Sequence, residues 1–166
     1  AHSALFDAEL TMKILGLVKK RQPYTWESFF KTSNKLDTET IFKKEKIITL
    51  NEYFYGKSRL YLCAPLHPKH CIHPVYQWGQ AIDLRVDVEA LLNLSINELK
   101  KEMKKTPKFL RTIRSNKAPI ILDQSYGIKE EPYNAIDPIL IKKRADLEKN
   151  DEKFAQNIMI ALREIA

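Results

Sequence analysis

Five short segments rich in β-branched and aromatic residues constrain the fold more than any other feature of this chain. Three follow one another, KIITL at 46–50, SRLYLCA at 58–64 and QAIDLRV at 80–86, and FLRTI and PIIL follow at 109–113 and 119–122. Segments of this length and composition between turn residues are typical of β-strands. Pro65, Pro68 and Pro74 confine the stretch between the second and third segments to a loop. The sequence therefore predicts a small antiparallel sheet.

Helical patterns surround these strands. Apolar residues at helical spacing predict a helix over 3–20, and Ser95 with Glu98 fits a capping box that begins a helix over 96–105. Asp137-Pro138 predicts a cap and a first helical position, followed by helices over 139–149 and 152–165. The order of the elements predicts an α+β fold, and five short strands can close into a small β-barrel decorated with several helices.

The charge balance narrows the class of partner. Lys and Arg number 28 against 21 Asp and Glu, so the net charge is +7 and the pI about 9.3. An excess of this sign favours a polyanionic partner. No apolar run approaches the roughly 18 residues of a membrane helix, so no membrane partner is expected. Two cysteines do not make a disulfide framework, which favours a reducing, cytoplasmic setting.

Aromatic residues lie among some of the basic positions of the sequence. Lys57, Arg59 and Tyr61 share one face of an alternating strand. Positive charge beside stacking platforms is typical of proteins that bind single-stranded nucleic acid, although a solvated basic face with its aromatics in the core has the same pattern. The lysine-rich helix 96–105 fits that second interpretation. The predicted DNA contacts are Arg59, Tyr61, Trp78, Arg111, Arg114 and Lys117.

Two other groups of residues could carry chemistry. His2 and Asp7 can point into one cleft if the histidine lies just before the first helix, and a metal-dependent phosphodiesterase needs such a base and metal ligand. The alternative is a terminal histidine and a surface aspartate. Cysteine and histidine, the preferred zinc ligands, also crowd the proline-rich loop, but their spacing matches no familiar zinc motif. That candidate group is Cys63, His67, His70, Cys71 and His73.

Four stretches in order resemble bacterial exodeoxyribonuclease I, a DEDDh-type 3′→5′ exonuclease family acting on single-stranded DNA. AHSALFDAELTMKILGLVKKRQP at the start is similar to its final exonuclease motif, and CAPLHP at 63–68 to a strand and loop. AIDLRVDVEALLNLSINELKK at 81–101 and SNKAPIIL at 115–122 resemble two later segments. The resemblance implies that 1–22 is the C-terminal helix of a truncated exonuclease domain and that 23–166 is an SH3-like accessory domain.

The resemblance also implies roles and partners. It makes His2 the general base and Asp7 a ligand to one of two Mg²⁺ ions, while the remaining carboxylates of the family lie upstream, so this chain alone is expected not to cleave DNA. The implied partners are single-stranded DNA, the exonuclease and helical domains of the parent chain, and the acidic C-terminal tail of single-stranded DNA-binding protein. Ser28 stands where the family has a tail-binding tyrosine, so tail binding does not follow for this chain.

Two functions are therefore predicted as alternatives. In the first, the barrel is an accessory region that grips single-stranded DNA for a nuclease that releases nucleoside monophosphates. In the second, the same positive surface is a docking module for an acidic tail. An independent zinc-binding domain is a third, separate interpretation.

Overall fold

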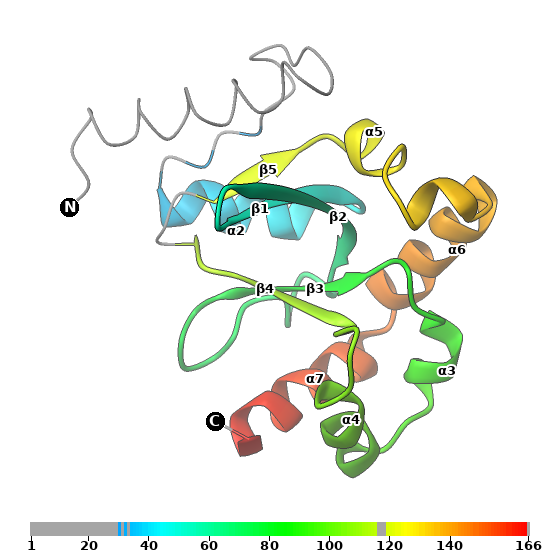
Figure 1. The fold of residues 1–166 in the computed structure, drawn as a ribbon. Helices are drawn as coiled ribbons and strands as arrows, with labels where there is room; N and C mark the ends of the chain where they lie inside the picture. The colour runs from blue at the N-terminus through cyan, green and yellow to red at the C-terminus, as the bar shows by residue number, and fades with distance from the viewer. Residues whose placement is uncertain (1–29, 31, 33, 116–118, 166) are drawn as a thin grey trace.

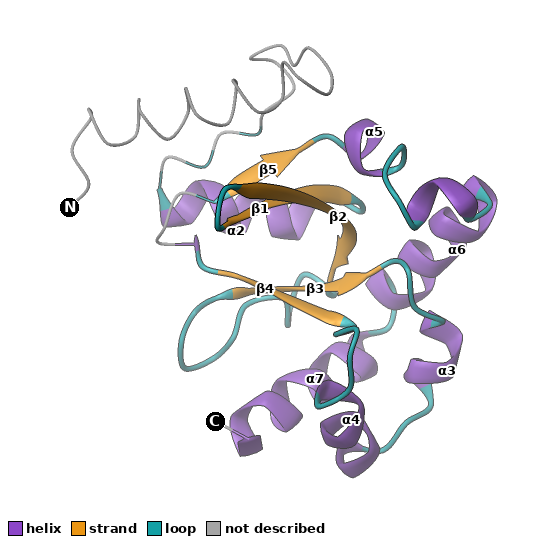
Figure 2. Ribbon diagram, in the orientation of Figure 1, coloured by secondary structure: helices purple, strands orange, loops and turns teal. Residues whose placement is uncertain are grey.

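A computed structural model describes residues 30, 32, 34–115 and 119–165 of the chain. All five predicted strands are present within them: β1 (Ile48–Phe54), β2 (Lys57–Pro65), β3 (Gly79–Asp83), β4 (Leu110–Ile113) and β5 (Ile120–Leu122). They form one antiparallel sheet in the order β4-β3-β2-β1-β5. Figures 1 and 2 show β3 and β4 lying below the other three strands, with helices below and to the right. The α+β class is therefore confirmed.

The closed barrel was a wrong prediction, because β4 and β5 end the sheet and do not pair with each other. The backbone before the first described helix lies along β5, where Phe30 N–H donates to Ile121 O at 2.9 Å. The Thr32 hydroxyl donates to Pro119 O at 2.6 Å. This segment protects the edge that β4 would need in order to close the sheet.

The hairpin between β1 and β2 explains the register of the sheet. Phe54 lies opposite Lys57, so Tyr55 and Gly56 form a two-residue turn. Both have positive φ, 49° and 80°, as a type I′ turn requires. The turn places Leu50 opposite Tyr61 and Glu52 opposite Arg59, which brings these four side chains to one face.

Helices pack on the sheet and on one another. The late helices α6 (Pro138–Lys149) and α7 (Glu152–Ile165) agree closely with the prediction, and α4 (Ile96–Met103) has the predicted Ser95–Glu98 capping box. The sequence reasoning missed α2 (Lys35–Lys44). Shorter elements are α3 (Val88–Leu92), α5 (Gln124–Gly127) and a 3₁₀ turn at Tyr133–Ala135. None of the described helices has the length and apolar character needed to cross a membrane.

A buried lysine joins two of these helices to the residue that follows β2. Lys149, at the end of α6, donates from Nζ to Phe42 O in the last turn of α2 at 2.9 Å and to Leu66 O at 3.3 Å. A cation is well placed at the carbonyl end of a helix. Phe42 also packs on Gly79, where a Cβ would lie 2.6 Å from its ring, so this position of β3 requires glycine.

Candidate nucleic-acid interface

A groove with a volume of about 770 Å³ occupies the place where the sheet fails to close. One wall comes from β1 at 50–53 and from Pro119 and Ile120, and the other comes from 112–114 at the end of β4. Gln80 of β3 and the end of α7 also contribute to its lining. The gap between the two edge strands, β4 and β5, therefore forms a concave surface on the molecule.

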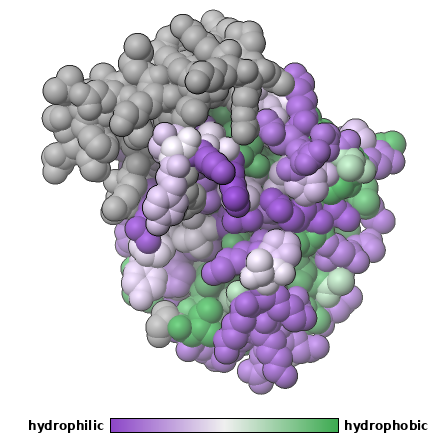
Figure 3. All heavy atoms as spheres, viewed as in Figure 1, coloured by the Kyte–Doolittle hydropathy of each residue, from purple (hydrophilic) through white to green (hydrophobic). Residues whose placement is uncertain are grey.

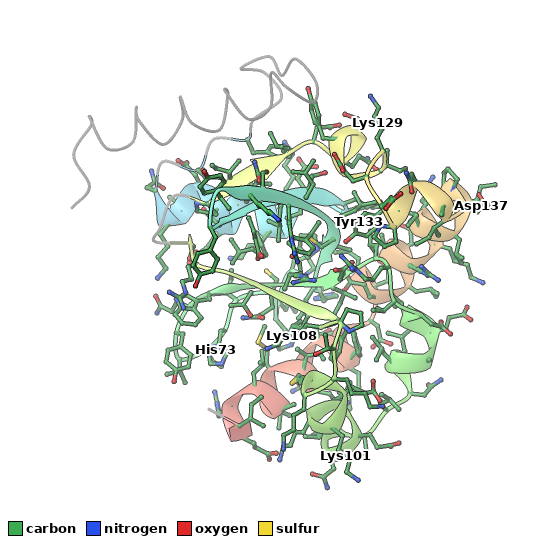
Figure 4. The ribbon with its side chains drawn as sticks, viewed as in Figure 1. His73, Lys101, Lys108, Lys129, Tyr133 and Asp137 are labelled. Carbon is green, nitrogen blue, oxygen red and sulfur yellow. The ribbon has the colours of Figure 1, made fainter. Side chains whose placement is uncertain are left out.

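An aromatic row lies along this groove. Trp78 and Tyr76 are stacked with ring centroids 5.0 Å apart at 24°, and the His73 ring lies 5.0 Å beyond Tyr76. The backbone fixes the loop, because His73 N–H donates to Trp78 O at 2.7 Å and His73 Nδ1 accepts from the N–H groups of Val75 and Tyr76. Figure 4 shows His73 on this loop. Burial, with Arg163 nearby, lowers the pKa of His73. The row is therefore a rigid platform whose histidine is neutral at physiological pH.

Arg114 completes the platform. Its guanidinium lies over the Trp78 ring, 4.8 Å from the centroid, within the range of a cation–π contact. Ser115 Oγ donates to Gln77 O at 3.0 Å and ties the end of β4 to the aromatic loop. The structure thus brings together Trp78 and Arg114, two of the six predicted DNA contacts, although they lie 36 positions apart in the sequence.

Three more of the predicted contacts line a second, more polar cavity of about 520 Å³. Arg59 and Tyr61 come from β2, Arg111 comes from β4, and Lys108 and Arg85 add positive charge. Glu130 and Glu131 also line the cavity. The positive charge of this cavity can attract a phosphate group, but acidic side chains of the protein balance part of that charge.

The balancing charge is Asp83, which is fully buried at the end of β3. Its Oδ2 accepts from Arg85 Nε at 3.0 Å and from Arg111 Nε and Nη2 at 3.2 Å. Its Oδ1 accepts from the Tyr133 hydroxyl at 2.6 Å and from Arg85 N at 3.1 Å. Burial, together with the Asp83 carboxylate, raises the pKa of Tyr133, so its hydroxyl remains a donor. Figure 4 shows Tyr133 beside the sheet.

Tyr61 belongs to this network more than to the surface. Only 8% of it is exposed, and the Arg111 guanidinium lies 3.7 Å from its ring centroid. Arg85 lies 5.6 Å from the same centroid. Tyr61 therefore orients the two arginines, while Arg59 is exposed beside it.

The aromatic row at Trp78 and the charged network around Asp83 lie at opposite ends of one strand. Trp78 precedes β3 and Asp83 is its last residue, a separation of roughly 17 Å at about 3.3 Å per residue. Figure 3 shows the surface over α4, which lies outside both clusters, as hydrophilic. The groove and the polar cavity are therefore separate subsites on one sheet.

Several predicted residues lie outside the part of the chain that the structure describes: His2, Asp7, Ser28 and Lys117. The proline-rich loop lies within it, and the described residues there contain no group of three or more His, Cys, Asp or Glu side chains arranged to hold a metal ion. Cys63 and Cys71 are buried free thiols, and His67 Nδ1 accepts from Lys69 N–H at 3.2 Å. The loop residues thus make local hydrogen bonds and do not converge on a zinc site.

Sequence reasoning also missed three buried or half-buried acids. Asp83 interrupts the apolar run AIDL, and Glu148 follows Ile141 and Ala145 on the buried stripe of α6. Glu52 occupies a groove-lining position of β1. A charged residue in an apolar pattern was the available signal in the first two cases.

Glu148 yields a testable prediction about stability. Both carboxyl oxygens are buried and have no hydrogen-bond partner among the described residues, and burial raises the pKa of Glu148 well above its usual value despite Lys149. A carboxyl of this kind is protonated more readily when the chain is folded, so it favours folding below its unfolded pKa, and that advantage is lost as pH rises through the folded pKa. We expect Glu148→Gln to abolish this fall in stability, which amounts to on the order of 1–3 kcal/mol. Urea unfolding from pH 5 to pH 8 measures it.

The control for that experiment is Glu89→Gln, since Glu89 is an exposed acid on α3 that pairs with Lys143 at 3.1 Å. Its pH profile should follow that of the unaltered chain. A Glu148→Gln profile parallel to that of the unaltered chain would contradict the prediction.

The fold is similar to part of several solved structures of exonuclease I. Exonuclease I from Methylocaldum szegediense matches with a TM-score of 0.63 and 22% identity over 98% of this chain and 37% of that one. Exonuclease I of E. coli in complex with a 5cy-dT13 oligonucleotide matches with a TM-score of 0.62 and 17% identity, over 96% and 37%. An ExoI/SSB-Ct complex matches with a TM-score of 0.64 and 18% identity, over 98% and 37%.

The sequence comparison agrees with the structural one. The chain is 28% identical over 177 aligned residues to exodeoxyribonuclease I of Buchnera aphidicola, which covers 96% of the chain and 40% of that protein. No family model matches. The predicted resemblance to exodeoxyribonuclease I is therefore confirmed, and the chain spans about 40% of the length of this curated relative.

Proposed function

We propose that residues 23–166 are an accessory region that binds single-stranded DNA for a nuclease of the exodeoxyribonuclease I type. The observation that carries the proposal is the open groove in which Trp78 and Tyr76 stack and Arg114 lies over Trp78. Exposed aromatic faces bind bases of any sequence, and neighbouring cations bind the backbone. One similar protein, exonuclease I of E. coli, was solved with an oligonucleotide, which supports this choice of ligand.

The remaining predicted contacts have complementary roles in this proposal. Arg59 and Arg111 bind phosphate at the polar cavity, where Lys108 adds charge and Tyr61 orients Arg111. Lys117 follows Arg114 closely in the sequence and is proposed as a further contact to the DNA backbone. The strand would thus place its bases in the groove and its backbone along the basic edges.

The nuclease activity belongs to the intact protein in this proposal. Residues 1–22 are its last exonuclease helix, with His2 as the general base and Asp7 as a ligand to one of two Mg²⁺ ions. Bound Mg²⁺ would stabilise charge on the phosphate that is cleaved from the 3′ end. The proposal places the protein in the cytoplasm and expects no degradation of single-stranded DNA by this chain with Mg²⁺.

Fluorescence anisotropy with labelled oligo(dT) across a salt series tests DNA binding by the chain. We expect binding at low salt, with an affinity that falls steeply and linearly in log[salt], because each phosphate contact releases bound counterions. An affinity that does not depend on salt, or no binding at low salt, would contradict the proposal.

A docking role for the acidic tail of single-stranded DNA-binding protein is the second candidate. It is supported by the match to an ExoI/SSB-Ct complex and by the net charge of +7. The buried Lys149 adds nothing to the positive surface for such a tail, because its Nζ donates to two backbone carbonyls in the interior. An acidic peptide ending in Phe, titrated in competition with oligo(dT), separates the candidates: docking alone predicts peptide binding without oligonucleotide binding.

A further inference from the structure

Two arginines of the polar cavity share one oxygen atom of a buried acid. Arg85 Nε donates to Asp83 Oδ2 at 3.0 Å, and Arg111 donates to the same oxygen from Nε and from Nη2, each at 3.2 Å. Strand pairing brings Arg111 there, since it lies opposite Ala81, two positions before Asp83 on β3. Both arginines line the cavity. Because they donate to one atom, their guanidinium groups lie next to each other.

Each guanidinium turns the same edge toward the protein. Arg111 uses Nε and Nη2 for Asp83, whereas Arg85 uses Nε for Asp83 and Nη2 for the Tyr133 hydroxyl at 3.2 Å. Among the described residues the Nη1 group of each arginine has no hydrogen-bond partner, and neither group belongs to the buried, unpartnered polar atoms. A guanidinium carries its five N–H donors in a fixed fork. The outer edge of each arginine, which carries Nη1, can therefore bind a ligand in the cavity.

The charge of this arrangement calls for an anion. One carboxylate, Asp83, balances only one of the two guanidiniums that it contacts. Both arginine side chains are largely buried, so water compensates the second charge only in part. A phosphodiester carries a single negative charge on two non-bridging oxygens, which suits two adjacent donor edges. Glu130 and Glu131 line the same cavity and oppose the doubly charged phosphate of a strand end.

We propose that Arg85 and Arg111 together clamp one internal phosphodiester of the bound strand, each outer edge donating to one non-bridging oxygen. This inference rests on the proposed function, since it assumes that single-stranded DNA reaches the polar cavity. It adds Arg85 to the contacts and joins it with Arg111 at a single phosphate. Asp83 and Tyr133 are then positioning residues, because they hold the inner edges of the two guanidiniums.

The test is a double-variant cycle in oligo(dT) binding by the full 166-residue chain, with Arg85→Gln, Arg111→Gln and the two combined. Each single change is expected to weaken binding roughly tenfold, as the loss of a charge-assisted hydrogen bond does. Because both arginines act on one phosphate, the double variant should lose well under the roughly hundredfold product of two independent contacts. Its salt slope should fall by about 0.7, the value for one phosphate of a single strand, and not by about 1.4.

Two further variants guard this test against loss of the fold. Arg85→Lys keeps a positive charge beside Asp83 but lacks the outer edge, so it should stay folded and still show most of the loss in affinity. Lys143→Gln removes the same charge from an exposed side chain of α6 outside both cavities, and it should change affinity little. Circular dichroism and thermal unfolding verify the fold of every variant.

A 5′-phosphorylated oligo(dT) identifies which phosphate is held. It should bind no tighter than the unphosphorylated strand if the clamp takes an internal phosphodiester. A gain from the 5′-phosphate that the double variant loses, independent losses with a slope change of about 1.4, or unaltered affinity in the double variant overturns the clamp and leaves the proposed function standing. No binding of oligo(dT) by the unaltered chain overturns both proposals.

Discussion

Asp83→Asn is expected to lower the free energy of unfolding by about 3–5 kcal/mol, the usual cost of breaking a buried ion cluster by removing one partner. Asp83 is fully buried and accepts five hydrogen bonds, from Arg85, Arg111 and Tyr133. The asparagine keeps the shape but removes the one negative charge that, among the described residues, pairs with both arginines. Their side chains are only 24% and 15% exposed, so water replaces that charge poorly.

The expected loss is large relative to the total stability of a single domain, which is typically about 5–15 kcal/mol. Equilibrium urea unfolding followed by circular dichroism measures it. Asp87→Asn is the matched control, because Asp87 is exposed and its side chain makes no capping hydrogen bond at α3. We expect that variant to change stability by less than about 0.5 kcal/mol.

A double variant tests whether charge is the cause. Arg111→Gln removes one of the two cations, so combining it with Asp83→Asn should cost less than the sum of the two single changes. Additive losses, or a loss below about 1 kcal/mol for Asp83→Asn alone, would show that the cluster behaves like a surface ion pair.

The strand pattern of the sequence predicted the sheet well, because strand residues were marked locally. Proline and turn residues mark the ends of the predicted strands, and the Tyr55-Gly56 turn fixes the register of the first hairpin. Closure of the barrel could not be predicted in the same way. It depends on which backbone occupies the outer edge of β5, and Phe30 makes that contact from more than 80 positions away.

The helices show the same limit. α6 and α7 carry strong end signals, whereas α2 has a weak apolar stripe in KLDTETIFKK. The available signals for α2 were the Asn34 cap, whose side chain accepts from Asp37 N–H at 2.9 Å, and the basic last turn. Lys149 donates to the carbonyl end of α2 from α6, a contact that no local pattern records.

The sequence predicted which residues could bind DNA, but it did not predict which of them lie together in the structure. The six predicted contacts were one set in the sequence, yet the structure divides those it describes between the groove and the polar cavity. Strand register makes the division: Asp83 lies opposite Cys63, and Ala81 lies opposite Arg111, so Arg111 reaches Asp83 and Tyr61 on one face. Such pairings depend on partners that are distant in the chain.

Trp78→Ala is expected to weaken oligo(dT) binding by roughly 5- to 150-fold, the effect of removing one stacked base at about 1–3 kcal/mol. The indole is the centre of the platform, since it contacts both the Tyr76 ring and the Arg114 guanidinium. Without it, Arg114 also loses the surface that orients its guanidinium. The change therefore removes a base contact and loosens a phosphate contact together.

Anisotropy titrations at one fixed salt concentration measure the loss, and Trp78→Phe should recover most of the affinity because it restores an aromatic face. Tyr55→Ala is the control, since this fully exposed aromatic side chain lies at the β1–β2 turn and lines neither cavity. If stacking is the cause, the salt slope should change little in Trp78→Phe, because the number of phosphates bound is the same. Equal affinities for Trp78→Ala and the unaltered chain would mean that bases do not enter the groove, and DNA contact would then rest on the basic cavity alone.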